Sequence, residues 1–170
     1  VRSRWRRLDT LVELDLSSNS LVGSIIPNVL SSWTSMTTLV LSDNELTGEL
    51  PSTVQNMQNL EVMKVDRNGF TGEIPASINF LTNLRTLDLS RNGFLGPVPE
   101  FRENLESLET AYLHNNNLTG AIDLCRVGPD AGEKDFASDC LPYDDGRPAE
   151  ISECLCCTKC CNDVAGCAPV

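Results

Sequence analysis

Hydrophobic residues recur in one pattern, five times, along the first two-thirds of the chain. Each copy follows the pattern LxxLxL, with Met, Val or Ala at some of the leucine positions. A polar run ending in asparagine comes next, then an apolar residue two positions later, a glycine two positions after that and, in four copies, a proline. The asparagines are spaced by 24 or 25 residues, and they are Asn19, Asn44, Asn68, Asn92 and Asn116. A fixed period of this length predicts a solenoid whose coils stack on one another.

Each repeated position has a physical role in such a coil. The alternation in LxxLxL predicts a short parallel strand, with Leu87 and Leu89 pointing inward and Asp88 outward. The asparagine follows the strand, where its amide can hydrogen-bond the backbone of neighbouring coils. The glycine permits a backbone conformation closed to other residues. After the proline we expect a helical or 3₁₀ turn, with serine at its N-cap near Ser52 and Ser77.

The pattern therefore predicts an α/β solenoid. We expect a right-handed horseshoe or superhelix, with short parallel strands on the concave face and helical or 3₁₀ turns on the convex face. Five repeats span residues 11–122, and the spacing of Leu8 indicates that residues 1–10 are the end of an upstream repeat. Because the ends of a solenoid must be covered, residues 123–170 are expected to form a cysteine-rich C-terminal cap.

The repeat resembles the plant-specific leucine-rich repeat, LxxLxLSxNxLxGxIPxxLxxLxxL. That class occurs in receptor-kinase ectodomains and polygalacturonase-inhibiting proteins, and the resemblance covers residues 8–122. It implies an extracellular, often glycosylated protein with a concave protein-binding surface. The tail departs from those families, which end in a short cysteine pair. Its string CLCCTKCC, starting at Cys154, instead resembles the C-terminal region of secreted leucine-rich-repeat proteins of diatoms and related stramenopile algae.

All eight cysteines lie in this tail. They suit either a disulfide-knit cap in an oxidising compartment or a thiolate metal cluster in a reducing one. The even count and the extracellular resemblance favour disulfides, but the spacing does not determine which cysteines pair. Adjacent cysteines should have different partners, because neighbouring residues rarely reach disulfide geometry. The eight are Cys125, Cys140, Cys154, Cys156, Cys157, Cys160, Cys161 and Cys167.

The composition and motifs limit which partners and activities we expect. The net charge of −11 argues against nucleic acid, because binding phosphates requires clustered lysine and arginine. No apolar run is long enough to span a bilayer. The one histidine, His114, has no serine or cysteine nucleophile at a recognisable spacing, and the acidic pairs of the tail lack EF-hand spacing. We therefore expect no enzyme activity, no cofactor and no metal site. Asn117-Leu118-Thr119 is the one N-glycosylation sequon.

The period also predicts which residues face outward from the concave strands. Exposed aliphatic and aromatic residues and a central basic group are typical of protein interfaces. The candidate contact residues are Val40, Val62, Lys64, Arg67, Asp88, Arg91, Tyr112 and His114. We expect an extracellular or surface-displayed module that binds a protein or peptide there. One alternative is a structural subunit of an extracellular or lumenal assembly, such as a wall, filament or large complex, contacting neighbouring subunits. Another is an inhibitor of a wall-degrading hydrolase.

Overall fold

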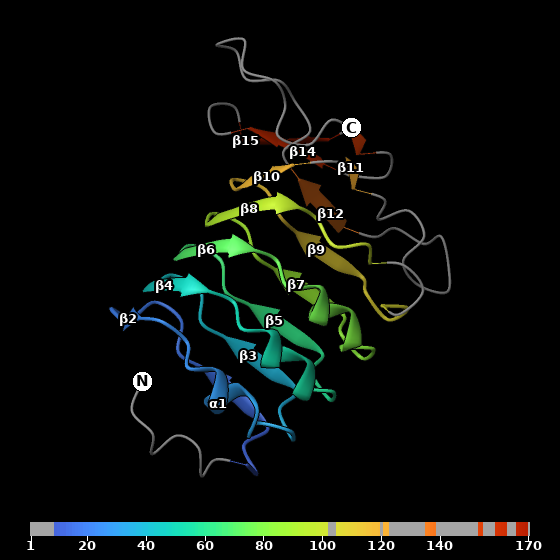
Figure 1. The fold of residues 1–170 in the computed structure, drawn as a ribbon. Coiled ribbons are helices and arrows are strands. Elements are labelled where there is room, and N and C mark those ends of the chain that lie inside the picture. Colours follow the sequence, from blue (N-terminus) through green and yellow to red (C-terminus); the bar gives the residue numbers. More distant parts are fainter. Residues whose placement is uncertain are drawn as a thin grey trace.

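The computed structural model describes residues 9–101, 105–119, 121–122, 135–138, 153–154, 159–162 and 166–169. Its coils stack along one axis, and successive coils add neighbouring strands to the same two sheets (Figure 1). The predicted solenoid of parallel strands and helical turns is therefore confirmed.

The larger sheet lines the concave face and contains the strands of the LxxLxL segments. Its first five strands are parallel, and each pairs with the strand of the next coil. The sheet continues past the fifth repeat and ends in an antiparallel strand. In spatial order the strands are β1 (Glu13–Asp15), β3 (Thr38–Val40), β5 (Val62–Lys64), β7 (Thr86–Asp88), β9 (Thr110–Tyr112), β12 (Asp135–Ser138), β14 (Lys159–Asn162) and β15 (Gly166–Pro169).

A second parallel sheet follows the asparagines, and the repeat pattern did not predict it. Gly48 and Gly72 lie in it with φ of 83° and 77°, which confirms the conformational role expected for the glycine. Its strands are β2 (Val22–Gly23), β4 (Glu45–Glu49), β6 (Gly69–Glu73), β8 (Gly93–Pro97) and β10 (Asn117–Thr119). A third, two-stranded sheet pairs β11 (Ala121–Ile122) with β13 (Glu153–Cys154).

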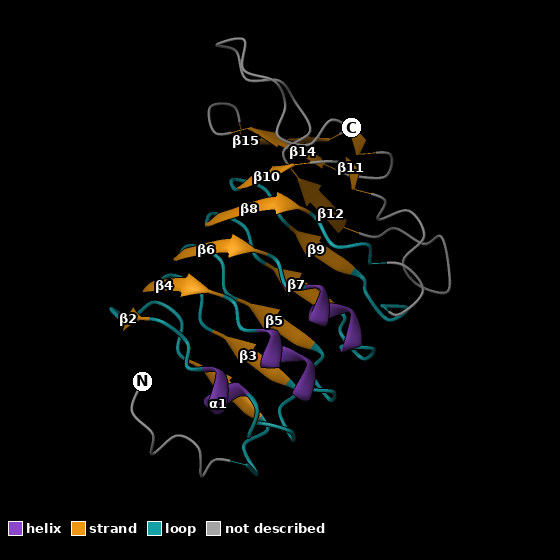
Figure 2. Ribbon diagram, in the orientation of Figure 1, coloured by secondary structure: helices purple, strands orange, loops and turns teal. Residues whose placement is uncertain are grey.

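Short helices form the remaining side of the coils (Figure 2). They are the α-helix α1 (Pro27–Leu30) and the 3₁₀ helices η2 (Ser52–Asn56) and η3 (Ala76–Phe80). The expected serine N-caps are wrong. The N-cap positions belong to Pro51 and Pro75, whose fixed extended backbone directs the chain into the helix without a side-chain cap. The hydroxyl of Ser77 is buried inside η3 and has no hydrogen-bond partner among the described residues.

The core lies between the two sheets and the helices. Leu87 and Leu89 are completely buried, as the strand alternation predicted. Val54 and Ile78 reach the same core from the 3₁₀ helices. Aliphatic and methionine side chains fill most of this core, so stability depends on stacking successive coils.

The asparagine ladder is formed as expected. The Asn68 amide donates to the carbonyls of Leu41, Val65 and Asp66, at 2.9, 3.1 and 3.1 Å. Its Oδ1 accepts the backbone N–H of Leu46 at 3.0 Å. Asn44, Asn92 and Asn116 make the equivalent contacts, so each of these four asparagines joins its own coil to the preceding one and satisfies backbone groups that the turn would leave unpaired.

Candidate functional site

The concave sheet places the outward residues of successive coils in straight columns. Asp15, Val40, Lys64, Asp88 and Tyr112 occupy one column, because each is the register partner of the next. A parallel column contains Glu13, Thr38, Val62, Thr86 and Thr110. These two columns agree with the sequence-based prediction. They bring the candidate residues of β3, β5, β7 and β9 onto one face.

Two valines give this face an apolar part next to its charges. Val40 is the register partner of Lys64, and Val62 lies two residues before Lys64 on the same strand. Residues two apart on a strand share one face of the sheet. Both valines are half-buried, so they are less exposed than the sequence suggested. A ligand that covers Lys64 would therefore also contact aliphatic surface.

Arg67 and Arg91 lie one coil apart, just after the concave strands. Both have a left-handed backbone, with φ of 51° and 55°. Their backbone N–H groups donate to the backbone carbonyls of Ser90 and His114 in the following coil, at 3.1 and 2.9 Å, and these hydrogen bonds hold the conformation. Both side chains are exposed, and no ion pair joins either to another described residue. Two guanidinium groups are thus presented side by side on an otherwise acidic protein.

Two carboxylates beneath this basic group serve the protein itself. Asp66 is buried and accepts a hydrogen bond from the Ser42 hydroxyl. Asp88 accepts the backbone N–H and the hydroxyl of Ser90, at 3.0 and 2.7 Å. Burial raises the pKa of Asp88, and the nearby Asp66 raises it further, while the Ser90 hydrogen bonds and Lys64 oppose the rise. Ser90 thus holds the Asp88 carboxylate on the concave face.

Asp66 and Ser90 are buried beside this face. They follow the strand, where the chain turns back toward the core, and only 9% and 4% of their surface is exposed. The repeat period alone does not reveal this turn.

Tyr112 and His114 are the candidate contact residues nearest the C-terminus. Their rings meet edge to face, with centroids 6.2 Å apart and planes at 77°. His114 is half-buried, and its Nδ1 is buried without a hydrogen-bond partner among the described residues. Burial lowers the pKa of His114, and the positive charge of Arg91 lowers it further, against a smaller opposite effect of Asp66. His114 is therefore a half-buried ring on this face whose neutral form is favoured.

Arg85 marks the other edge of the face. It pairs with Glu109 at 2.7 Å and with Glu61 at 3.8 Å, so three coils share one charge network. All three side chains are more than half exposed, and exposed pairs of this kind contribute little to stability. The repeat period places Glu61, Arg85 and Glu109 in one column, and the ion pairs between them are a feature that we did not predict.

The sequon lies away from the concave face. Asn117 and Thr119 are exposed on β10, and Leu118 between them is buried. β10 belongs to the second sheet, as the register partner of β8. A glycan on Asn117 would therefore extend from that sheet and leave the concave columns free.

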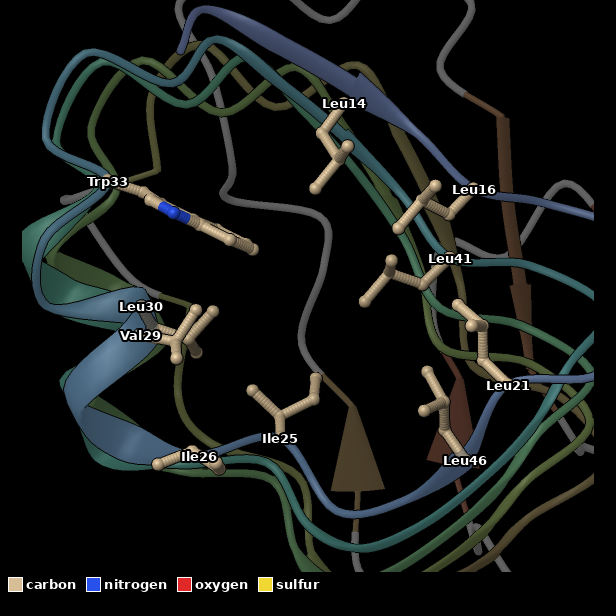
Figure 3. Close-up of a pocket in the computed structure, with 10 residues that line it drawn as sticks. All are labelled: Leu14, Leu16, Leu21, Ile25, Ile26, Val29, Leu30, Trp33, Leu41 and Leu46. Carbon is tan, nitrogen blue, oxygen red and sulfur yellow. The ribbon is translucent and has the colours of Figure 1, made fainter. Parts of the chain in front are cut away.

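The first coil leaves an apolar opening at its end of the core (Figure 3). Leu14, Leu16 and Leu21 lie on one side of this cavity and Trp33 and Leu30 on the other. The three leucines are only partly buried. Their equivalents in the next coil are at most 6% exposed, and they are Leu39, Leu41 and Leu46.

Of the cysteines, Cys154, Cys160, Cys161 and Cys167 belong to described strands, and the other four lie outside the described residues. In the part of the chain that the structure describes, no group of three His, Cys, Asp or Glu side chains could hold a metal ion. Within the same part, no helix has the length and apolar character needed to cross a membrane.

Stacked coils, an inner asparagine ladder and a strand-lined concave face define a leucine-rich-repeat solenoid. Family models described as leucine-rich repeat match residues 10–33 and 34–94. The chain belongs to the leucine-rich repeat family. None of the curated proteins matches it.

Solved structures of plant receptor ectodomains are similar to this chain. The leucine-rich-repeat ectodomain of the receptor kinase SOBIR1 from Arabidopsis thaliana is 34% identical, with a TM-score of 0.66, over 74% of this chain and 67% of that one. A chain of the Arabidopsis thaliana BIR3–SERK2 complex is 30% identical, with a TM-score of 0.66, over 85% of this chain and 74% of that one.

The structure of the Arabidopsis receptor kinase HAESA with the peptide hormone IDA and the co-receptor SERK1 is also similar. The identity is 30% and the TM-score 0.68, over 78% of this chain. This chain spans only 23% of the matched HAESA chain. It resembles a short section of that receptor.

Proposed function

We propose that this chain is a non-catalytic, extracellular or surface-displayed interaction module that binds a protein or peptide through its concave face. One observation carries the proposal: Arg67 and Arg91, one coil apart at the ends of the concave strands, are exposed without a charged partner among the described residues. Exposed guanidinium groups without an internal partner are typical of residues that anchor protein interfaces.

Similar proteins support this use of the fold. The related HAESA structure contains a peptide hormone and a co-receptor, and that of RGFR1, 28% identical, contains RGF2. Those relatives are receptor ectodomains, which supports an extracellular location here. The proposed contact surface consists of Val40, Val62, Lys64, Arg67, Asp88, Arg91, Tyr112 and His114.

The cap and the modifications belong to the same proposal. We infer that residues 123–170 form a disulfide-rich cap like that of secreted diatom leucine-rich-repeat proteins, and that Asn117 carries an N-glycan. Residues 11–122 form the repeat domain.

The test begins with a peptide display library selected on the immobilised full chain. Selected peptides are then measured against a variant with Lys64, Arg67, Arg91 and Tyr112 changed to alanine. We expect at least about a tenfold loss of affinity, since tenfold corresponds to about 1.4 kcal/mol. A matched variant on the second sheet, with Thr47, Glu49 and Thr71 changed to alanine, should bind normally. Unchanged binding by the concave variant, with both variants folded, would overturn the concave-face proposal.

The alternative role as a structural subunit makes a different prediction. Its subunits would associate through the apolar opening at Leu14, Leu16 and Leu21, because exposed apolar surface of that kind drives assembly. Sedimentation of the full chain at increasing concentration distinguishes the two roles. A monomer at all concentrations favours the interaction module, and concentration-dependent growth favours the assembly.

A further inference from the structure

The last two strands of the concave sheet place two cysteines opposite each other. β14 and β15 run antiparallel, and Cys161 is the register partner of Cys167. The neighbouring pair is Cys160 with Ala168, and the pair nearest the turn is Asn162 with Gly166. The structure therefore joins, by backbone pairing, two of the eight cysteines whose partners the sequence could not assign.

We propose that Cys161 and Cys167 form a disulfide that closes the hairpin of β14 and β15. Opposite residues of an antiparallel pair have Cα atoms about 4.5 or 5.5 Å apart, depending on the hydrogen-bonding site. Disulfides join Cα atoms about 4.4–6.8 Å apart. Both kinds of pair fall within this range of Cα separations, so the register is compatible with a disulfide.

The remaining described cysteines have other register partners. Cys160 pairs with Ser138 of β12 on one side and Ala168 of β15 on the other. Cys154 pairs with Ile122 of β11. Neighbouring positions of a strand belong to opposite faces of the sheet, so Cys160 and Cys161 occupy different faces. Cys161 and Cys167 are thus the one pair of cysteines in direct register among the described strands.

The position of the hairpin gives the bond a structural purpose. β15 is the last strand in the described order of the concave sheet, and it is the strand that runs antiparallel to its neighbour. An edge strand presents unpaired backbone groups that invite other chains to add to the sheet. A covalent link across the hairpin holds the terminal strand in place and closes the solenoid at its C-terminal end.

The Cys161–Cys167 bond forms by thiol–disulfide exchange. The two thiols lose two protons and two electrons as the sulfur–sulfur bond forms. A disulfide oxidant such as glutathione disulfide accepts them and becomes two thiols. The inference rests on the proposed extracellular location, since only an oxidising compartment maintains such a bond.

The experiment maps the disulfides of the full chain, reduced and then oxidised with glutathione disulfide. Cleavage after Lys159 and before Asp163 separates residues 160–162 from residues 163–170. We expect residues 163–170 to be linked to the first fragment through Cys161, which fragmentation between Cys160 and Cys161 identifies. A free Cys167, or its linkage to any other cysteine, would overturn the pairing.

Two double variants provide the matched control. C161S/C167S removes both partners and should leave every other linkage and no free thiol. C160S/C167S removes one cysteine from each of two different disulfides. Cys161 then lacks its own partner, so the disulfide map should change. The first variant overturns the proposal if its other linkages change.

A separate measurement tests the location on which the inference rests. Thiols are counted on the chain as secreted from eukaryotic cells, without added oxidant. Eight free thiols there would overturn the oxidised, extracellular cap. The glutathione map would still decide whether Cys161 pairs with Cys167, so the two failures are distinguishable.

Discussion

Asn68 donates its side-chain amide to the Leu41 carbonyl of the preceding coil, 2.9 Å away. The same side chain makes hydrogen bonds to three further backbone groups, including the N–H of Leu46. Asn19 occupies the equivalent place in the first described coil, but it is exposed, and among the described residues its amide donates to carbonyls of its own coil, Leu16 and Ser17. The same residue thus has different importance in the middle and at the end of the ladder.

Asn68→Ala should therefore destabilise the protein strongly. It leaves partly buried carbonyls and one N–H without partners, and each such group costs about 1–3 kcal/mol. We expect the free energy of unfolding to fall by about 2–3 kcal/mol in urea titrations. Asn19→Ala is the matched control and should change it by about 0.5 kcal/mol or less. Equal effects of the two substitutions would contradict a ladder that couples coils.

The stacked rings of Phe70 and Phe94 make a second prediction. Their centroids are 6.1 Å apart and their planes differ by 8°, and both side chains are completely buried. Phe70→Ala removes this contact and leaves a cavity, so we expect a loss of about 3–5 kcal/mol in thermal or urea unfolding. Phe80 is 59% exposed, and Phe80→Ala should cost less than about 1 kcal/mol. A small effect of Phe70→Ala would show that the core can collapse around the site.

The core was predictable because the sequence repeats its apolar spacing. Leu87 and Asp88 fall on opposite faces of a strand for geometric reasons that any copy of the repeat obeys. The second sheet was not predictable in the same way. Its residues, such as Thr47 and Glu49, are polar and give no apolar alternation, and their strand follows from backbone pairing with the next coil.

The site was predictable as far as its columns. Period alone placed Lys64 beside Asp88, and the registers agree. Period did not predict that Arg67 and Arg91 have a left-handed backbone, or that Asp66 is buried. Those features arise where the chain leaves the strand, and they depend on hydrogen bonds to the following coil, such as Arg67 N–H to the Ser90 carbonyl.

The sequon on β10 predicts a glycan that does not interfere with binding. The chain secreted from eukaryotic cells should lose mass when treated with a peptide N-glycosidase. Thr119→Ala removes the sequon and should abolish this shift, while Thr110→Ala, on the concave sheet, should preserve it. Because β10 belongs to the second sheet, the unglycosylated variant should bind selected peptides with unchanged affinity. A glycan that blocks binding would place the contact surface on the second sheet instead.

His114 predicts how stability depends on pH. Burial and Arg91 lower its pKa in the folded protein from the ordinary value of 6.5, so the unfolded chain binds a proton more readily. Stability is therefore full above pH 6.5 and is lost as pH falls below it. Urea titrations from pH 8 to pH 5.5 should show a steeper loss for the native chain than for His114→Phe, which retains a ring beside Tyr112.

Because His114 is the one histidine, its ring-proton resonance reports its pKa without ambiguity. Arg91→Ala should raise that pKa, since it removes a positive charge that lowers the pKa while burial remains. Arg85→Ala, which removes an arginine paired with Glu61 and Glu109, should leave the titration unchanged. Asp66→Asn should lower the pKa, because the Asp66 carboxylate favours the protonated ring. A histidine whose pKa lies at or above its ordinary value would show that the ring is open to solvent. The concave face around Tyr112 and His114 would then be solvated and able to carry a positive charge.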